Sequence, residues 1–138
     1  MPAPEGIALA FPEDGGCFGC SPSNPSGMQL TFRREGDRVC ARYRIPDRFH
    51  GAPGIAHGGI VAALLDEVSC AAAFALRNVY VVTGELSVRY RRPCPVKVLI
   101  ALSARVAAQH ARYVTVEAEL RRAGELLAAS SGKFFFAT

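Results

Sequence analysis

One segment of this chain, residues 58–76, is long, apolar and free of proline, and it constrains the fold more than any other. Its large apolar side chains recur at helical spacing, so they occupy one broad arc when placed at about 100° per residue. At 1.5 Å per residue such a helix spans about 28 Å, which is long for a chain of 138 residues. We therefore expect one central helix against which the rest of the chain packs.

Runs of alternating apolar and polar residues on both sides of this segment predict β-strands. Before it, residues 28–34 and 38–45 flank a turn signal, Glu35-Gly36-Asp37, and predict a hairpin. After it, three or four strands are expected in the runs 80–91, 96–107, 111–122 and 126–136. One long helix with a meander of antiparallel strands is an α+β layout, in which the helix is the apolar partner of the sheet.

Length and composition predict a single domain over residues 1–138, with residues 1–27 as an irregular arm because five of the nine prolines lie there. A chain of this size buries roughly two-thirds of its unfolded surface, so its core needs no disulfide and no structural metal. Asp66 and Glu67 interrupt the apolar stretches, and the first residues lack a signal-peptide pattern. We therefore expect no membrane partner and a cytoplasmic location.

Charge and cysteine spacing argue against two further classes of partner. Sixteen basic against twelve acidic residues is a mild excess, and no nucleic-acid-binding motif accompanies it, so no nucleic-acid partner is expected. Cys17 and Cys20 form one Cys-x-x-Cys pair, whereas a structural zinc site needs four ligands. The other three cysteines show no second pair, so we predict no metal and no other cofactor, and the role of Cys17 and Cys20 stays open.

Candidate chemistry is concentrated at residues 54–67. Gly58 and Gly59 at a helix start leave the first-turn N–H groups sterically open, at the positive end of the helix dipole, where they can polarise a carbonyl oxygen. Asp66 lies eight residues after Gly58, about 12 Å along the axis, so one helix cannot easily bring both to the same atom. Two helices packed antiparallel across a two-fold axis can, which predicts two equivalent sites shared between subunits.

Three groups of motifs spread over most of the chain. They are His57-Gly58-Gly59 followed by Leu64-Leu65-Asp66-Glu67, an upstream Cys17-Phe-Gly-Cys20 with residues 24–30, and Val88-Arg-Tyr-Arg-Arg-Pro93. In this order and spacing the sequence resembles the hotdog-fold acyl-CoA thioesterases, and among them the PaaI-like group of the 4-hydroxybenzoyl-CoA thioesterase superfamily. The resemblance implies a curved antiparallel sheet wrapped around one long central helix. It also implies a homodimer, or a dimer of dimers, with sites at the subunit interface.

The resemblance also implies roles for three residues. The Gly58 N–H would polarise the thioester carbonyl, Asp66 would act as nucleophile or as general base for water, and the Thr83 hydroxyl would lie near that acid. Glu67 is the adjacent carboxylate. Its position at the edge of the apolar arc favours an ion pair or a rim position over catalysis.

Substrate-binding residues are expected in two places. His50 corresponds to a polar loop side chain of such enzymes, and His57 and Gly59 are expected at the helix entry, where His57 anchors the chain by hydrogen bonding. Coenzyme A carries phosphates, and a cluster of cations lies at the end of the strand expected after the helix. These cations are Arg89, Arg91 and Arg92, of which strand alternation places the first two on one face.

The resulting prediction is an acyl-CoA thioesterase that hydrolyses an aryl or a short- or medium-chain acyl-CoA to the free acid and coenzyme A. Its expected partners are the acyl-CoA substrate and further copies of the chain. Two alternatives keep the fold and change the function: a hotdog module that binds acyl-CoA without catalysis, and a hotdog hydratase or dehydratase. The acyl group, and the choice between dimer and tetramer, lie beyond what the sequence predicts.

Overall fold

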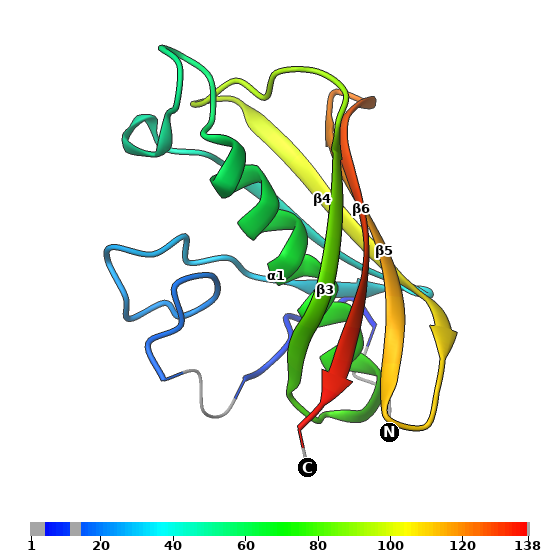
Figure 1. The fold of residues 1–138 in the computed structure, drawn as a ribbon. Coiled ribbons are helices and arrows are strands. Elements are labelled where there is room, and N and C mark those ends of the chain that lie inside the picture. The colour runs from blue at the N-terminus through cyan, green and yellow to red at the C-terminus, as the bar shows by residue number, and fades with distance from the viewer. Residues whose placement is uncertain (1–4, 12–14, 138) are drawn as a thin grey trace.

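The computed structural model describes residues 5–11 and 15–137 (Figure 1). One long helix lies against an antiparallel sheet of six strands, so the predicted α+β class is confirmed. The helices are η1 (Asp47–Phe49, a 3₁₀ turn) and α1 (Gly58–Arg77). The strands are β1 (Arg33–Glu35), β2 (Arg38–Arg44), β3 (Val81–Tyr90), β4 (Leu99–Gln109), β5 (Tyr113–Arg122) and β6 (Glu125–Phe136).

Helix α1 begins at the predicted residue and ends one residue beyond the predicted end. Asn78 closes it in the left-handed conformation, with φ of 56°. The helix contacts every strand from β2 to β6, so the sheet curves around it. The face that it buries belongs to the predicted apolar arc, with side chains 3% exposed or less at Val61, Leu64, Leu65 and Val68.

By length and composition alone α1 could cross a membrane. The interruption of the apolar stretches by Asp66 and Glu67 had predicted no such helix. However, 56% of its most apolar stretch is buried inside the protein. The core helix of a folded domain passes the same test of length and composition, because both environments select apolar side chains. The burial of α1 under the sheet therefore accounts for its hydropathy.

The strand order in the sheet is β1-β2-β4-β5-β6-β3, with every neighbouring pair antiparallel. Strands β4, β5 and β6 form a meander, but β3 pairs with β6 and not with β4, so the expected meander of all the later strands is wrong. The cause is the segment 91–98, where Pro93 and Pro95 have no N–H for a ladder. This segment hydrogen-bonds instead to the carbonyl oxygens of Gly54 and Ile45, and it thereby delivers β4 beside β2. Strand β3 is consequently an edge of the sheet.

The predicted first strand, residues 28–34, is also largely wrong, because the structure has a strand only at Arg33–Glu35. Gln29 takes a positive φ of 54°, which interrupts an extended ladder. The Leu30 N–H instead donates to the Gly19 carbonyl at 2.8 Å. The alternation in this segment thus reflects packing against the arm and not pairing within the sheet.

The arm before β1 packs on α1 on the side away from β5 and β6 (Figure 1). Its Phe11 ring lies 4.8 Å from the ring of Phe74 on α1, between ring centroids, and 6.2 Å from that of Phe32. The part of the arm that is described contains no helix and no named strand. Residues 1–4, 12–14 and 138 lie outside the described residues, and the single domain over residues 1–138 stays a prediction.

Candidate functional site

The entry of α1 is fixed by His57, which is its N-cap residue. The Nδ1 atom of His57 accepts the Gly59 N–H at 2.9 Å, and the His57 N–H donates to the Phe49 carbonyl at 2.9 Å. An N-cap side chain satisfies one of the unpaired donors of the first turn. In the part of the chain that the structure describes, no protein acceptor takes the Gly58 N–H. This N–H, on an exposed residue at the positive end of the helix, is therefore not used by the described protein groups.

Tyr90 is a site residue that the sequence analysis missed. Its hydroxyl donates to the Gly58 carbonyl oxygen at 2.7 Å, so the last residue of β3 holds the first residue of α1. Tyr90 stands inside the Val88–Pro93 motif, in which roles were assigned only to the arginines, and its place in this motif was the available signal. A hollow of about 340 Å³ lies beside this contact and is lined by Gly58, Tyr90, Arg91 and Arg92, among others.

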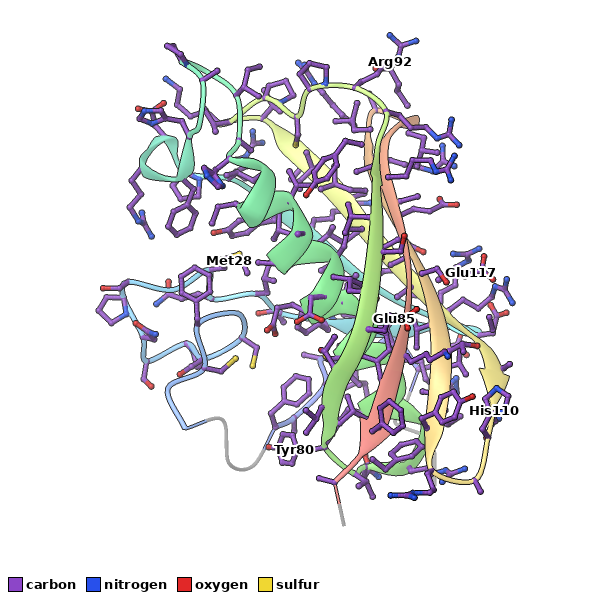
Figure 2. The ribbon with its side chains drawn as sticks, in the orientation of Figure 1. Met28, Tyr80, Glu85, Arg92, His110 and Glu117 are labelled. Atoms are coloured by element: carbon purple, nitrogen blue, oxygen red, sulfur yellow. The ribbon has the colours of Figure 1, made fainter. Side chains whose placement is uncertain are left out.

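The three arginines differ in position. Arg91 and Arg92 line the hollow beside Gly58, whereas Arg89 does not. Strand β3 ends at Tyr90, and the Arg91 and Arg92 N–H groups both donate to the Leu127 carbonyl, at 2.8 and 3.1 Å. Arg91 therefore lies beyond the strand, and strand alternation does not place it on one face with Arg89 as expected. Arg92 projects outward at the end of the sheet (Figure 2) and forms an exposed ion pair with Glu125 at 3.4 Å.

Asp66 and Thr83 come together at the open side of α1. The Thr83 hydroxyl on β3 donates to Asp66 Oδ1 at 2.7 Å. Because that proton is donated, the Cys70 thiol, 3.5 Å away, is the donor to the Thr83 oxygen. Burial and the neighbouring Asp66 charge raise the pKa of Cys70 to about 12, which keeps it a thiol at neutral pH. The result is a directed chain of hydrogen bonds that ends on the carboxylate.

A β-bulge next to Thr83 sets the direction of its side chain. The register of β3 against β6 shifts between Thr83 and Glu85, so Gly84 is the extra residue. A side chain at Gly84 would collide with the ring of Phe135, which packs on this glycine. Bulges reorient adjacent side chains, and this one turns Thr83 toward α1.

Glu67 is half-buried, in keeping with the edge of the helical arc, but the ion pair considered for it is not found among the described residues. Its Oε2 lies 4.0 Å from the Cys17 sulfur in the arm. Burial raises its pKa to about 7, and the adjacent Asp66 charge adds to the shift. The helix thus directs two successive carboxylates to different surroundings, one to Thr83 and one to the arm.

Other sequence-predicted residues lie apart from this pair. The His50 Nδ1 is 2.6 Å from the Asp47 carbonyl, so its ring is held within its own loop. Gly58 is separated from Asp66 of the same chain by two helical turns, about 12 Å along the axis. One chain therefore presents two half-sites, a helix N-terminus with basic residues and an Asp66–Thr83 pair.

Comparison with known proteins decides the family. The model of the thioesterase superfamily matches residues 53–129, which is more than half of the chain. This chain belongs to the thioesterase superfamily. The match contains both half-sites, from His57 to Thr83 and on to Arg92. A search of the curated proteins found no match for this thioesterase superfamily member.

Solved structures share the fold of this superfamily member. The thioesterase superfamily protein RHA08564 is 28% identical with a TM-score of 0.74, and the alignment covers 83% of this chain but only 57% of that one. The PaaI protein of the E. coli phenylacetic acid degradation operon is 14% identical, with a TM-score of 0.73 and coverage of 80% and 81%. A hypothetical thioesterase protein from Streptococcus pneumoniae, solved with coenzyme A, is 17% identical, with a TM-score of 0.69 and coverage of 73% and 82%. The expected hotdog fold of the PaaI-like thioesterases is confirmed.

Proposed function

We propose that this protein is an acyl-CoA thioesterase, which hydrolyses an aryl or a short- or medium-chain acyl-CoA to the free acid and coenzyme A. The observation that carries the proposal is the 2.7 Å hydrogen bond from the Thr83 hydroxyl to Asp66. It orients a half-exposed carboxylate on a helix, and it leaves the second carboxylate oxygen available to take a proton from water or to attack a carbonyl carbon.

In this mechanism the thioester carbonyl accepts the Gly58 N–H, which stabilises the negative charge that develops on oxygen by a few kcal/mol. Water, deprotonated by Asp66, or Asp66 itself then attacks the carbonyl carbon. The C–S bond breaks, and the coenzyme A thiolate leaves and takes up a proton. When Asp66 is the nucleophile, the acyl group is left on its carboxylate as a mixed anhydride, and a water molecule hydrolyses this anhydride in a second step to release the free acid and restore Asp66. Tyr90 fixes the Gly58 peptide unit in position through its 2.7 Å hydrogen bond, so it is a positioning residue.

A second copy of the chain is proposed to supply the Gly58 N–H, because the two half-sites of one chain are too far apart to meet. The exposed edge strand β3 supports this, since a ten-residue edge with unpaired N–H and C=O groups is a template for pairing. Val82 on this edge is 64% exposed and Tyr90 is 53% exposed, both large side chains that a partner would cover. A homodimer, or a dimer of such dimers, follows as the proposed assembly.

Coenzyme A is proposed to lie with its phosphates near Arg91 and Arg92, which line the hollow next to Gly58. Guanidinium groups bind phosphate through paired charge-assisted hydrogen bonds. The Streptococcus pneumoniae relative that was solved with coenzyme A supports a ligand of this class. A cytoplasmic location, where coenzyme A thioesters are made and used, is part of the same proposal.

The test of the proposal is free-thiol release from a panel of acyl-CoAs, with short-chain, long-chain and aromatic acyl groups, by the purified protein. We expect hydrolysis of at least one aromatic or short- or medium-chain member, with saturation kinetics. Saturable binding of acyl-CoA without any thiol release would contradict the proposal and favour a binding module.

Replacing Thr83 with valine tests the oriented carboxylate. Valine has the same shape and suits a strand, so the fold should persist while the hydrogen bond to Asp66 is lost. Hydrogen bonds to charged groups contribute roughly 1.5–3 kcal/mol, so we expect kcat to fall by about 10-fold or more with little change in KM. Thr83→Ser, which restores the hydroxyl, should recover most of the loss in the same steady-state assay. Equal kcat values for Thr83→Val and Thr83→Ser would show that the hydroxyl is dispensable.

A further inference from the structure

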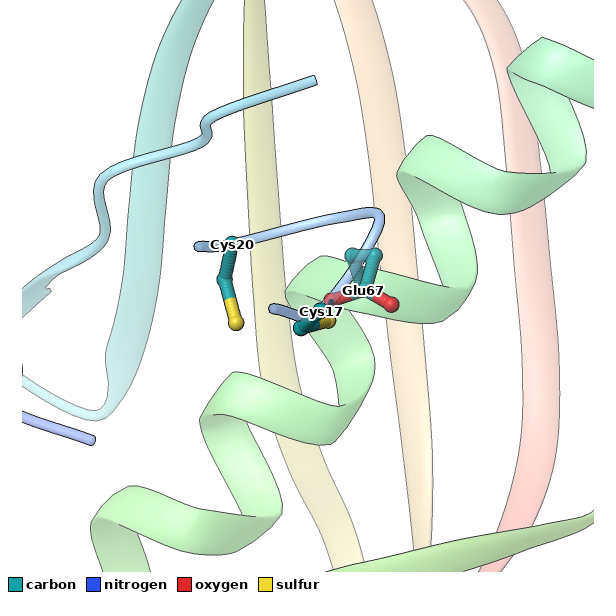
Figure 3. Close-up of side chains that lie close together, drawn as sticks. All are labelled: Cys17, Cys20 and Glu67. Carbon is teal, nitrogen blue, oxygen red and sulfur yellow. Dashed lines mark hydrogen bonds between the residues drawn. The ribbon is translucent and has the colours of Figure 1, made fainter. Parts of the chain in front are cut away.

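The arm and helix α1 bring three potential metal ligands together beside the proposed site. The sulfur atoms of Cys17 and Cys20 and a carboxylate oxygen of Glu67 all lie within 4.8 Å of one another (Figure 3). Cys17 and Glu67 are 50 positions apart in the sequence, so the fold alone creates this cluster. All three side chains are half-buried.

The loop that carries the two cysteines is shaped around the cluster. The Gly19 N–H donates to the Cys17 sulfur at 3.3 Å, a contact that stabilises negative charge on sulfur. Gly19 also packs directly on the Glu67 carboxyl group, and any side chain at position 19 would collide with it. A glycine in the middle of the Cys-x-x-Cys segment therefore leaves the space that the Glu67 carboxyl group occupies, and a larger residue there would displace that side chain.

The ligand atoms of the cluster are of the kinds that bind a metal cation. Glu67 is a half-buried carboxylate that forms no ion pair with any of the described residues. An ionised carboxylate removed from water is costly unless it is paired or coordinates a metal, and without a metal Glu67 lowers this cost by holding its proton more tightly, which a bound cation would displace. Two thiol groups next to it lose their protons readily to a bound metal, which would leave three anionic ligands around one cation.

We propose that Cys17, Cys20 and Glu67 form a zinc-binding site that fastens the arm to helix α1. Zinc takes cysteine sulfur at about 2.3 Å and carboxylate oxygen at about 2.0–2.2 Å, which places tetrahedral ligand atoms roughly 3.5–3.8 Å apart. The Cys17 sulfur and the Glu67 oxygen are already 4.0 Å apart. Thiolate ligands select zinc over magnesium and calcium, which prefer oxygen alone.

The fourth coordination position faces a cavity of about 270 Å³. Its walls include both cysteines and Glu67, together with Cys70 one helical turn after Glu67 and the rings of Phe11 and Phe74. A water molecule can complete the tetrahedron there. No metal is expected from the cysteine spacing alone, because Cys17 and Cys20 have no second cysteine pair, and the third ligand proposed here comes from the helix.

Such a site has a consequence for the arm. A metal that binds only the folded protein stabilises it, and here it ties residues 17–20 to the helix residue that follows Asp66. We expect zinc to raise the melting temperature of the chelator-treated protein, and we expect the gain to depend on the two cysteines.

The experiment is metal reconstitution of the full chain, purified under reducing conditions and stripped with a chelator. Zinc, and cobalt as its coloured substitute, are added alone, followed by desalting and elemental analysis. We expect one metal per chain and, with cobalt, thiolate-to-metal charge-transfer absorption. Cys20→Ser should lose both the bound metal and the cobalt absorption. Its zinc affinity should fall more than about 100-fold, since loss of an outer-shell partner alone costs 10–100-fold in metal affinity. Cys40→Ser, the same change on β2, should retain both.

Several outcomes would overturn the proposal. Equal metal content in the wild type and Cys20→Ser would indicate adventitious binding, and a Cys17–Cys20 disulfide that persists under reducing conditions would exclude the ligand set. Glu67→Gln keeps both thiols, and its circular dichroism reports whether it folds. We expect it to weaken zinc binding at least tenfold while remaining folded. Wild-type affinity in this variant would remove Glu67 as a ligand and contradict the proposal.

Discussion

Replacing Asp66 with alanine is expected to lower kcat for acyl-CoA hydrolysis by about 10²- to 10⁴-fold, the range for loss of a positioned acid–base group. The Thr83 hydroxyl donates to Asp66 and to no other described carboxylate. No neighbouring carboxylate is therefore positioned to take over the role of Asp66. Arg91 and Arg92 are proposed to hold the phosphates of coenzyme A and not the thioester on which Asp66 acts, so KM should change little. Steady-state thiol release on the preferred acyl-CoA measures both constants.

The matched control for Asp66→Ala is Asp37→Asn, which removes an exposed carboxylate in the β1–β2 turn. We expect its kcat to equal that of the wild type. Circular dichroism of Asp66→Ala should match that of the wild type, since the half-exposed carboxylate is not part of the core. Full turnover in a folded Asp66→Ala protein would remove the proposed mechanism.

Replacing Gly58 with proline is expected to lower kcat by about 10²- to 10³-fold, as loss of one oxyanion donor does elsewhere. Gly58 is the first residue of α1, a position that proline suits because its missing N–H has no helical partner there. The preceding His57 has ψ of 138°, an extended value that the residue before proline adopts. The substitution therefore deletes the proposed donor while the helix start is preserved.

Gly58→Ala is the control that keeps the N–H and adds a side-chain carbon. That carbon would meet the Tyr90 hydroxyl at 3.8 Å, an ordinary van der Waals contact. We expect near wild-type kcat from Gly58→Ala and a large loss only from Gly58→Pro, measured side by side with melting temperatures. Equal kcat for the two variants would show that the backbone N–H takes no part in catalysis.

Local patterns predicted the helix and most of the strands well. The apolar arc of α1 and the glycines before it determine where the helix starts, and this depends only on nearby residues. Resemblance to a family, and not spacing, placed Thr83 beside Asp66. The alternation of apolar and polar residues at 28–34 wrongly predicted a strand over the whole segment, because burial against the arm produces the same pattern as burial in a sheet.

Contacts between distant segments were beyond the sequence. The pairing of β3 with β6 depends on where the segment 91–98 finds hydrogen-bond partners, which no local pattern encodes. The approach of Cys17 to Glu67 likewise depends on how the arm folds over α1. Tyr90 was missed because its role is a hydrogen bond to a backbone carbonyl, which the Val88–Pro93 motif that contains it does not reveal.

The central claim is that Asp66 of one subunit acts with Gly58 of another, and complementation tests it most directly. Asp66→Ala and Gly58→Pro chains, each inactive alone, are co-expressed in equal amounts with different tags, and the oligomers are purified together. Each site needs Asp66 from one chain and Gly58 from its partner, so random assembly gives about a quarter of the sites both intact residues. The account predicts recovery of about a quarter of wild-type kcat per site. No recovery, with mixed oligomers shown by capture through both tags, would contradict it.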